Sequence, residues 1–374
     1  MLSGFIPFCY FFLTLSISII GTIDKRDGIG RQSLELGHAL KKHYPIHVVP
    51  IGEYGELDPE DMALLYLDYR YLNQVVLVNT SLPEIPYIVE SLKKYRREGQ
   101  IFVCYTMVES DFVDPYFIEV LKFFDHLIVP DPFLVDVFQK SGLTLPITVI
   151  PLAVDLSPFL EASIKKWARN PFIFGNYSAC IPRKDQLLLV KAFEKKFSGK
   201  PEVKLRINAR GGDPVCIQTI KNYLKGRNLS NVEFAIESKS APEYLNLFRE
   251  TDCYVSPSWG EGFSIQPRQA MAMGLPVIVS PNSGQKTIAD SGLAYALKKE
   301  YLVDASYTQG FGFFDMGQMW ASDVDELADL MEEAHRHYHA SMKNNKLRRQ
   351  WAAQYDFEKG TFVEEFCQFF NELK

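Results

Sequence analysis

Residues 256–280 read SPSWGEGFSIQPRQAMAMGLPVIVS and join two apolar stretches through a glycine-containing loop and a helix-like segment. The overlapping run CYVSPS predicts a strand that ends here, and PVIVS predicts the next strand. Between them we expect a helix with Pro267 at its first position and Gly274 at its C-cap, which are positions that these residues favour. The succession of strand, loop, helix and buried strand is typical of a parallel α/β sheet.

The loop WGEGFSI places Glu261 between two glycines. Glycine lets the backbone approach a ligand closely, and the N-terminus of a helix attracts negative charge. The backbone of Gly262, Phe263, Ser264 and Ile265 is therefore a candidate anion-binding site, with Glu261 poised at a cleft instead of in a core. The alternative is an ordinary glutamate in a solvated turn.

The same alternation of continuous apolar runs and amphipathic helices extends along most of the chain. It runs from about residue 16 to residue 151 and starts again after residue 170. We therefore expect an α/β protein of two Rossmann-like, doubly wound domains that face a cleft, residues 1–157 and 158–356. A C-terminal helix over residues 357–374 is expected to pack back on the first domain. Because ligands of open α/β sheets bind at the carboxyl ends of strands, the site is expected in the cleft.

The amino-acid composition of the chain excludes some classes of binding partner. The chain of 374 residues has a formal net charge of -6, so it lacks the basic surface that a nucleic-acid partner requires. Its six cysteines are scattered without a close pair, which indicates reduced thiols in a cytoplasmic protein. The acidic run DVD at residues 323–325 opens a predicted helix, where acids act as caps, so we expect no metal there.

The N-terminus allows two interpretations. Residues 1–21 contain no charged side chain and are long enough to cross a bilayer. The run LSISII followed by a glycine loop instead predicts the first strand of an α/β domain. We therefore expect residues 1–15 to be an apolar extension of a cytoplasmic protein, with peripheral anchoring at the inner face of the membrane as the further possibility.

Several motifs together resemble one enzyme family. The segment GEGFSIQPRQAMAMGLPVIVS resembles the E-x7-E region of the family 4 retaining glycosyltransferases, which have the GT-B fold and are relatives of bacterial glycogen synthase and sucrose synthase. VIPLAVD, RKDQLLLVKAF and GIGRQSLELGHAL are similar to further parts of that family. The resemblance implies transfer of a sugar from a UDP- or GDP-sugar to a glycan or lipid-linked acceptor, with retained anomeric configuration and without an obligatory metal or other cofactor.

Cations at two predicted helix starts agree with an anionic donor. Arg183 and Lys184 begin the run KDQLLLVKAF, and Arg31 follows Gly28 and Gly30 at the other start. The positive end of a helix dipole disfavours cations, and a bound diphosphate would reverse that penalty. Each of these side chains could instead be a solvated surface cation.

The resemblance also assigns roles to single residues. It implies that Lys184 binds the diphosphate, that Glu261 contacts the donor sugar, and that position 269 contacts the ribose. The second acid of the motif is replaced by Gln269, whose amide still offers a hydrogen-bond acceptor. The arginine that the family carries five residues before its lysine falls on Ala179, and Arg183 is the candidate to replace it.

Glu109 is the third candidate catalytic residue, beside Glu261 and Lys184. It follows the predicted strand Ile101 to Val108 in the run CYTMVESD and is expected to face the cleft. There it could bind acceptor hydroxyls or assist a proton transfer, and the alternative is a helix N-cap.

Two other functions stay open at this level. A GT-B nucleotide-sugar epimerase would use the same donor without an acceptor. A non-catalytic sugar-nucleotide-binding subunit would explain why Ala179 and Gln269 differ from the family pattern.

Overall fold

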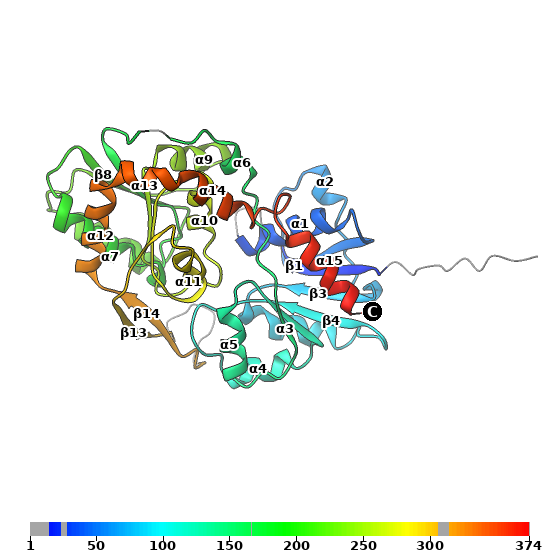
Figure 1. Ribbon diagram of the computed structural model, residues 1–374. Coiled ribbons are helices and arrows are strands. Elements are labelled where there is room, and N and C mark those ends of the chain that lie inside the picture. Colours follow the sequence, from blue (N-terminus) through cyan, green and yellow to red (C-terminus); the bar gives the residue numbers. More distant parts are fainter. Residues whose placement is uncertain (1–14, 24–27, 166, 306–313, 374) are drawn as a thin grey trace, which may run out of the picture.

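A computed structural model describes residues 15–23, 28–165, 167–305 and 314–373. Two six-stranded sheets, both parallel throughout, form its two α/β units (Figure 1). The first sheet has the order β2-β1-β3-β4-β5-β6 and the second the order β12-β11-β10-β7-β8-β9. The expected fold class is confirmed: the chain is an α/β protein with two Rossmann-like domains.

The strands of the first sheet are β1 (Ile17–Thr22), β2 (Ile46–Ile51), β3 (Val75–Asn79), β4 (Ile101–Tyr105), β5 (His126–Val129) and β6 (Ile147–Val149). The second sheet holds β7 (Phe172–Asn176), β8 (Val203–Ala209), β9 (Val232–Ile236), β10 (Cys253–Ser256), β11 (Val277–Val279) and β12 (Tyr295–Ala296). A separate antiparallel hairpin consists of β13 (Glu300–Asp304) and β14 (Gln318–Ser322).

The helices of the first half are α1 (Gly28–Leu40), α2 (Pro59–Met62), α3 (Ile85–Leu92), α4 (Pro115–Leu121), α5 (Phe133–Lys140) and α6 (Ser157–Glu161). Those of the second half are α7 (Gln186–Phe197), α8 (Pro214–Leu224), α9 (Ala241–Glu250), α10 (Ile265–Ala272), α11 (Ser283–Asp290), α12 (Val324–Arg336), α13 (Tyr338–Ser341), α14 (Asn345–Ala353) and α15 (Phe362–Glu372). Short 3-10 turns are η1 (Tyr69–Tyr71), η2 (Leu82–Glu84), η3 (Pro182–Lys184) and η4 (Met342–Asn344).

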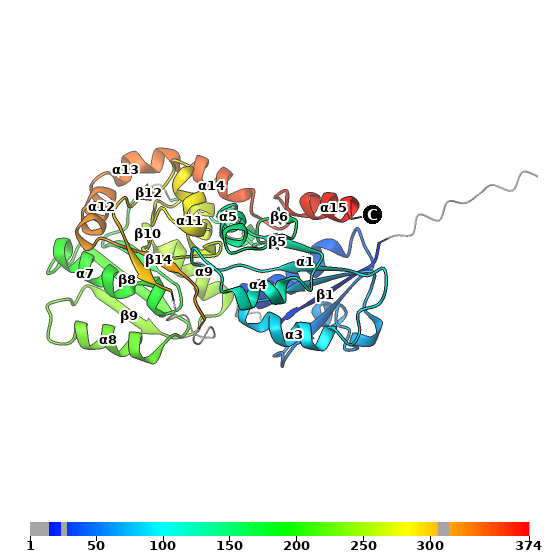
Figure 2. The ribbon, with the colours of Figure 1, turned by 90° about the horizontal axis from the view of Figure 1, so that it is seen from below.

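Apolar side chains cover both faces of the first sheet. Residues of α1 and α15 pack on one face, and residues of α3, α4 and α5 pack on the other. Burial on both faces explains why these strands are continuous apolar runs instead of alternating ones. Helix α15 contacts the first domain through Phe366 against Tyr105 and Phe370 against Tyr44, although it follows the second domain in the sequence (Figure 2).

The chain passes between the domains twice, and the two passages lie together. The buried carboxylate of Asp356 accepts a hydrogen bond from the backbone N–H of Leu156 at 2.9 Å, and Val154 forms a β-bridge with Asp356. The β13–β14 hairpin makes a further connection, because the backbone N–H of Gln318 donates to Asp111 of the first domain at 2.7 Å. The sequence interpretation did not include this hairpin.

The N-terminal predictions are tested only in part. The predicted first strand is present as β1, whereas residues 1–14 lie outside the described residues. Within the described ranges, every helix is too short or too polar to span a bilayer.

Candidate active site

The order of the second sheet brings two loops together. Strands β7 and β10 are neighbours, so the loops at their carboxyl ends lie side by side. The loop after β7 carries Arg183 and Lys184, and the loop after β10 carries Glu261. Lys184 Nζ lies 2.5 Å from Glu261 Oε1, and an Arg183 amino group lies 3.0 Å from Glu261 Oε2.

The first domain adds a fourth charge. Glu109 lies beyond the carboxyl end of β4, and its Oε1 atom is 2.9 Å from the Arg183 guanidinium. Glu109 therefore points toward the second domain, and the N-cap of the following helix is Asp114 instead. Glu109, Arg183, Lys184 and Glu261, here called the charge cluster, contain two cations and two anions that join the domains.

Burial and the neighbouring charges shift the pKa values of Glu261 and Lys184 in opposite directions. Glu261 is only 4 % exposed and Lys184 8 %. Burial by itself would raise the pKa of Glu261, but the charges of Lys184 and Arg183 outweigh it and hold that pKa at about 2. Burial lowers the pKa of the Lys184 ammonium, and the adjacent Glu261 carboxylate opposes that shift. Glu261 is consequently a buried carboxylate that stays ionised across the physiological range.

Residues that the sequence interpretation missed hold these loops in place. The indole N–H of Trp259 donates to Asp185 at 2.7 Å, and the backbone N–H of Trp259 donates to the carbonyl oxygen of Arg183 at 2.7 Å. The backbone N–H of Glu261 donates to the Ser283 hydroxyl at 2.8 Å. These partners are distant in sequence, and no local pattern marks them.

Arg183 and Lys184 lie just before the helix instead of in its first turn. We expected Arg183 and Lys184 at the start of the helix, but α7 begins at Gln186 and both residues lie in the preceding turn η3. The physical reason is Asp185, which adopts a left-handed conformation (φ 45°) and caps α7 by accepting a hydrogen bond from the Leu188 N–H at 3.2 Å.

The helix after Glu261 is also displaced from its expected start. Helix α10 begins at Ile265, so Pro267 is its third residue and not its first. Ser264 has a left-handed backbone (φ 68°) and is the N-cap, which starts the helix earlier. Gly274 follows the helix with φ 80°, the left-handed conformation expected of a glycine there.

Gly260 and Gly262 allow a close contact with the first domain, whereas we expected them to allow a close approach of a ligand. A Cβ atom on Gly260 would lie 1.9 Å from the carbonyl oxygen of Glu109, and one on Gly262 would lie 2.3 Å from the sulfur of Met107. The glycines thus let the Glu261 loop approach the backbone of the first domain, where we had expected room for a ligand. Glu261 itself is buried between the domains instead of standing free in the cleft.

The remaining predicted residues lie in the α10 segment or at the start of α1. The Phe263 side chain packs on Arg268 and Tyr355, so only its backbone remains a candidate for an anion. Gln269 is buried in α10, and its carbonyl oxygen accepts a hydrogen bond from Tyr244 at 3.0 Å.

Gly28 and Gly30 form the first turn of α1 in the first domain. The Arg31 side chain lies outside the described residues.

Comparisons with known structures agree with this architecture. Anabaena HepE in complex with UDP and glucose superposes with a TM-score of 0.67 at 15% identity, covering 96% of this chain and 99% of HepE. Sucrose-phosphate synthase from Thermosynechococcus elongatus gives a TM-score of 0.65 at 16% identity, again covering 96% of this chain and 99% of the other. Both belong to the GT-B class of two-domain glycosyltransferases, and this chain has the same fold.

Sequence comparisons match part of the chain to one enzyme family. Residues 170–311 match the family model of the Glycosyl transferases group 1. Uncharacterized glycosyltransferase 335 of Sulfolobus islandicus rod-shaped virus 1 is 25% identical over 240 residues, which is 61% of this chain and 66% of that relative. The match thus spans slightly less than two thirds of the relative's length. Residues 170–311 are thus similar to the group 1 glycosyltransferases, within a chain that has the GT-B fold.

Proposed function

We propose that the chain transfers a sugar from a UDP- or GDP-sugar to a glycan or lipid-linked acceptor, with retention of the anomeric configuration and without a metal or other cofactor. The observation that carries the proposal is the buried Glu261–Lys184 pair, 2.5 Å apart, with Arg183 beside it at the carboxyl ends of β7 and β10. Carboxyl ends of parallel strands are where such folds bind ligands.

The charge balance supports a diphosphate as the anion. Arg183 and Lys184 are neutralised by Glu109 and Glu261 in the arrangement described above. A diphosphate carries enough negative charge to compete with both carboxylates for the two cations. When it does so, Glu261 is released from Lys184, and its carboxylate can accept hydrogen bonds from hydroxyls of the donor sugar.

The same two cations favour the departure of the leaving group. As the bond from sugar to phosphate breaks, negative charge accumulates on the diphosphate, and Arg183 and Lys184 stabilise it where water is largely excluded. The first turn of α10 also has backbone N–H groups without partners inside the helix, which favours an anion nearby. Glu109 is then placed to bind an acceptor hydroxyl from the first domain.

The ligands of structurally similar proteins support a nucleotide-sugar donor. The HepE structures contain UDP, UDP with glucose, or UDP-glucose, and the TarM enzyme of S. aureus has been crystallised with UDP and a glycerol-linked sugar. These ligands belong to those proteins. They support a nucleotide-sugar donor for this chain and leave the base, the sugar and the acceptor to experiment.

The test is a panel of UDP- and GDP-sugars, with and without cell-derived glycan and lipid acceptors, in which the released nucleoside diphosphate is measured. We expect acceptor-dependent release with at least one donor, undiminished by a chelator. NMR of the product then gives the anomeric configuration, and an inverted product would contradict the retaining mechanism. Release without any acceptor would instead favour hydrolysis, and conversion of the donor into an isomeric nucleotide sugar without release would favour epimerisation.

A second candidate is a non-catalytic subunit that binds a sugar nucleotide. It is favoured by one observation, the Tyr244 hydrogen bond that occupies the carbonyl oxygen of Gln269. This candidate predicts measurable nucleotide binding in calorimetry together with no turnover on any donor. The panel described above separates the two.

We also propose that the chain acts in the cytoplasm, with the apolar residues 1–15 allowing peripheral contact with the inner face of the membrane. Cell fractionation of the full chain and of a variant with Phe5, Phe8 and Phe11 changed to serine tests this proposal. Membrane recovery that is equal for both would contradict the contact.

A further inference from the structure

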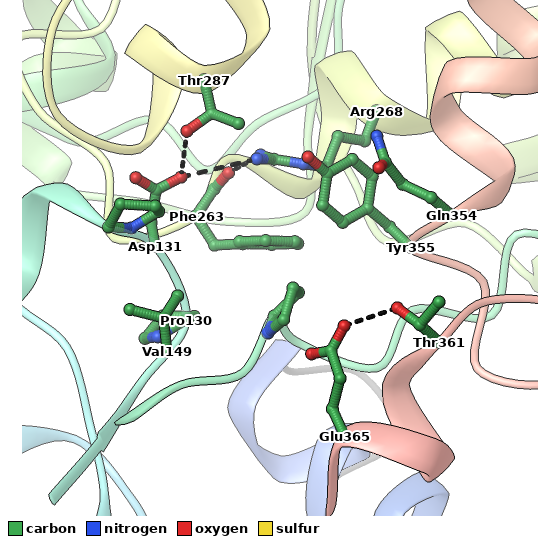
Figure 3. A pocket seen from close by; sticks show the side chains of 12 residues that line it. Pro130, Asp131, Val149, Phe263, Arg268, Thr287, Gln354, Tyr355, Thr361 and Glu365 are labelled. Atoms are coloured by element: carbon green, nitrogen blue, oxygen red, sulfur yellow. Dashed lines mark hydrogen bonds and ion pairs between the residues drawn. The ribbon is translucent and has the colours of Figure 1, made fainter. Parts of the chain in front are cut away.

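A cavity of about 170 Å³ lies between the two domains, apart from the charge cluster (Figure 3). It is lined by residues of five segments, of which three supply the side chains discussed below. Asp131 follows β5 of the first domain, Phe263 and Arg268 belong to the α10 region of the second domain, and Tyr355 and Glu365 belong to the C-terminal passage between the domains. None of the four residues of the charge cluster lines it.

One wall of the cavity contains a buried cation, Arg268, whose hydrogen-bonding capacity is only partly used. Arg268 has no exposed surface, and one of its amino groups donates to the carbonyl oxygens of Phe263 and Ser264. Its Nε and Nη2 atoms make no well-aligned hydrogen bond within the described residues, and the Tyr355 side chain lies against the guanidinium and favours its charged form. The carboxylate of Asp131 lies 3.7 Å from Nη2, which balances the charge but is too long for a hydrogen bond. An acceptor atom inside the cavity would satisfy these buried donors.

Acceptors of hydrogen bonds also face the cavity. Asp131 is buried, and one of its oxygens accepts a hydrogen bond from the Thr287 hydroxyl at 2.7 Å. Glu365, in the first turn of α15, accepts one from Thr361 at the rim of the cavity. Each carboxylate has about four acceptor positions, so both retain capacity for a ligand.

The signs of these charges restrict the class of ligand. An anion would be attracted by Arg268 but repelled by Asp131 and Glu365, and a cation would meet the opposite difficulty. A neutral molecule with several hydroxyl groups avoids both, because a hydroxyl can accept from Arg268 and donate to either carboxylate.

The volume of the cavity and its apolar walls narrow the class of ligand further. The volume is that of roughly six water molecules at about 30 Å³ each, which suits one sugar ring and not a nucleotide. The aromatic rings of Phe263 and Tyr355, with prolines 130, 132 and 151, supply apolar surface for the C–H groups of such a ring. Apolar walls with a few convergent polar groups are characteristic of small-molecule sites.

We propose that this interdomain cavity binds the ring of a neutral sugar through its hydroxyl groups, at a site distinct from the charge cluster. Because its residues come from both domains, an occupied cavity holds the domains together beside the active site. The sugar can be a free monosaccharide or one unit of a neutral glycan, since the two present the same hydroxyl chemistry.

The test uses the full chain and ligand-observed NMR titrations with glucose, galactose, N-acetylglucosamine and maltotriose. Glu365→Ala removes the rim acceptor, and we expect it to weaken sugar binding at least about tenfold, as loss of a charge-assisted hydrogen bond does. Glu364→Ala is the matched control, because Glu364 is an exposed glutamate on the same helix that does not line the cavity. Thr361→Trp, an exposed change that fills the rim, should abolish binding without unfolding the protein.

The titrations distinguish a free sugar from a glycan unit and show whether the proposal fails. Binding of monosaccharides supports a free sugar, and binding of maltotriose alone supports a glycan unit. Absence of binding, equal effects of Glu364→Ala and Glu365→Ala, preference for glucuronate over glucose, or displacement of the sugar by UDP or GDP would each overturn the proposal. Donor turnover is measured separately. The transferase proposal can therefore fail while a Glu365-dependent sugar site remains, and the sugar site can fail while transferase activity remains.

Discussion

The Arg183 guanidinium lies 2.9 Å from Glu109 of the first domain and 3.0 Å from Glu261 of the second. One side chain therefore joins carboxylates that belong to different domains. The contact depends on a close approach of the two backbones, which Gly260 permits. The relative position of the domains and the electrostatics of the candidate active site are thus coupled through a few atoms.

We predict that Gly260→Ala separates the domains at this contact. The new Cβ would lie 1.9 Å from the carbonyl oxygen of Glu109, a backbone atom that cannot move aside without moving the domain. Turnover should fall at least about tenfold, because misplacement by about 1 Å costs that much or more, and small-angle scattering should report a larger radius of gyration. Gly211→Ala is the control, since a Cβ there meets nothing within 4 Å. Full activity in Gly260→Ala would show that this approach is not needed.

We predict that Glu261→Gln lowers turnover by at least about a hundredfold and leaves nucleoside diphosphate binding intact or stronger. The neutral amide keeps the shape but cannot neutralise Lys184, which is left as a buried cation. The diphosphate then supplies the missing negative charge, so the rise in melting temperature on adding the nucleotide should be larger than in the parent. A parallel loss of binding and turnover would instead mean that Glu261 holds the loop and has no separate role in catalysis.

Lys184→Met should weaken binding of the nucleoside diphosphate by roughly 10- to 100-fold and leave binding of the nucleoside nearly unchanged. The expected size is that of one charge-assisted hydrogen bond, about 1.5 to 3 kcal/mol. Isothermal titration with both ligands measures the difference. Lys195→Met serves as the control, because Lys195 is an exposed residue of α7 paired with Asp325. Equal losses for the nucleoside and its diphosphate would remove Lys184 from the phosphate site.

Gln269→Glu should tighten nucleotide binding or leave it unchanged, with turnover within about tenfold of the parent. A carboxylate at this position can still accept the Tyr244 hydrogen bond and has further acceptor positions for ribose hydroxyls. Tyr244→Phe frees the amide to reorient, and we expect nucleotide affinity to change by only a few-fold. If the parent shows no turnover with any donor while the Gln269→Glu variant does, the result would support the non-catalytic subunit.

The pKa of Glu261 predicts how stability depends on pH. This pKa is lowered from the ordinary 4.5 to about 2 by the adjacent cations, so the ionised form favours the folded state. The contribution, about 3 kcal/mol at most, is complete above pH 4.5 and is lost as the pH falls toward 2. Denaturant unfolding should therefore show a stability gap between the parent and Glu261→Gln that is constant from pH 5 to 7 and closes below pH 4. A gap that stays constant down to pH 3 would contradict the lowered pKa.

Local patterns in the sequence were sufficient for the fold class. Continuous apolar runs predicted strands buried on both faces, and Gly274 predicted the end of α10, because these properties depend on neighbouring residues alone. The first residues of the helices were predicted less well. Ser264 and Asp185 adopt left-handed conformations that move the starts of α10 and α7, and nothing in their residue types requires this. The β13–β14 hairpin was missed since its residues are partly exposed and lack clear alternation.

The residue types of a donor site were visible in local patterns: Glu261 beside glycines, and Lys184 with Arg183 before a helix. Their partners depend on how the strands are ordered in the folded domain. Lys184 and Glu261 are 77 residues apart, and they meet because β7 and β10 are neighbours in the sheet. Strand order follows from how helices pack on both faces of a sheet, which is a property of the whole domain. Arg268 and Asp131 meet for the same kind of reason, since each is placed by its own domain and the contact exists only where the two domains join.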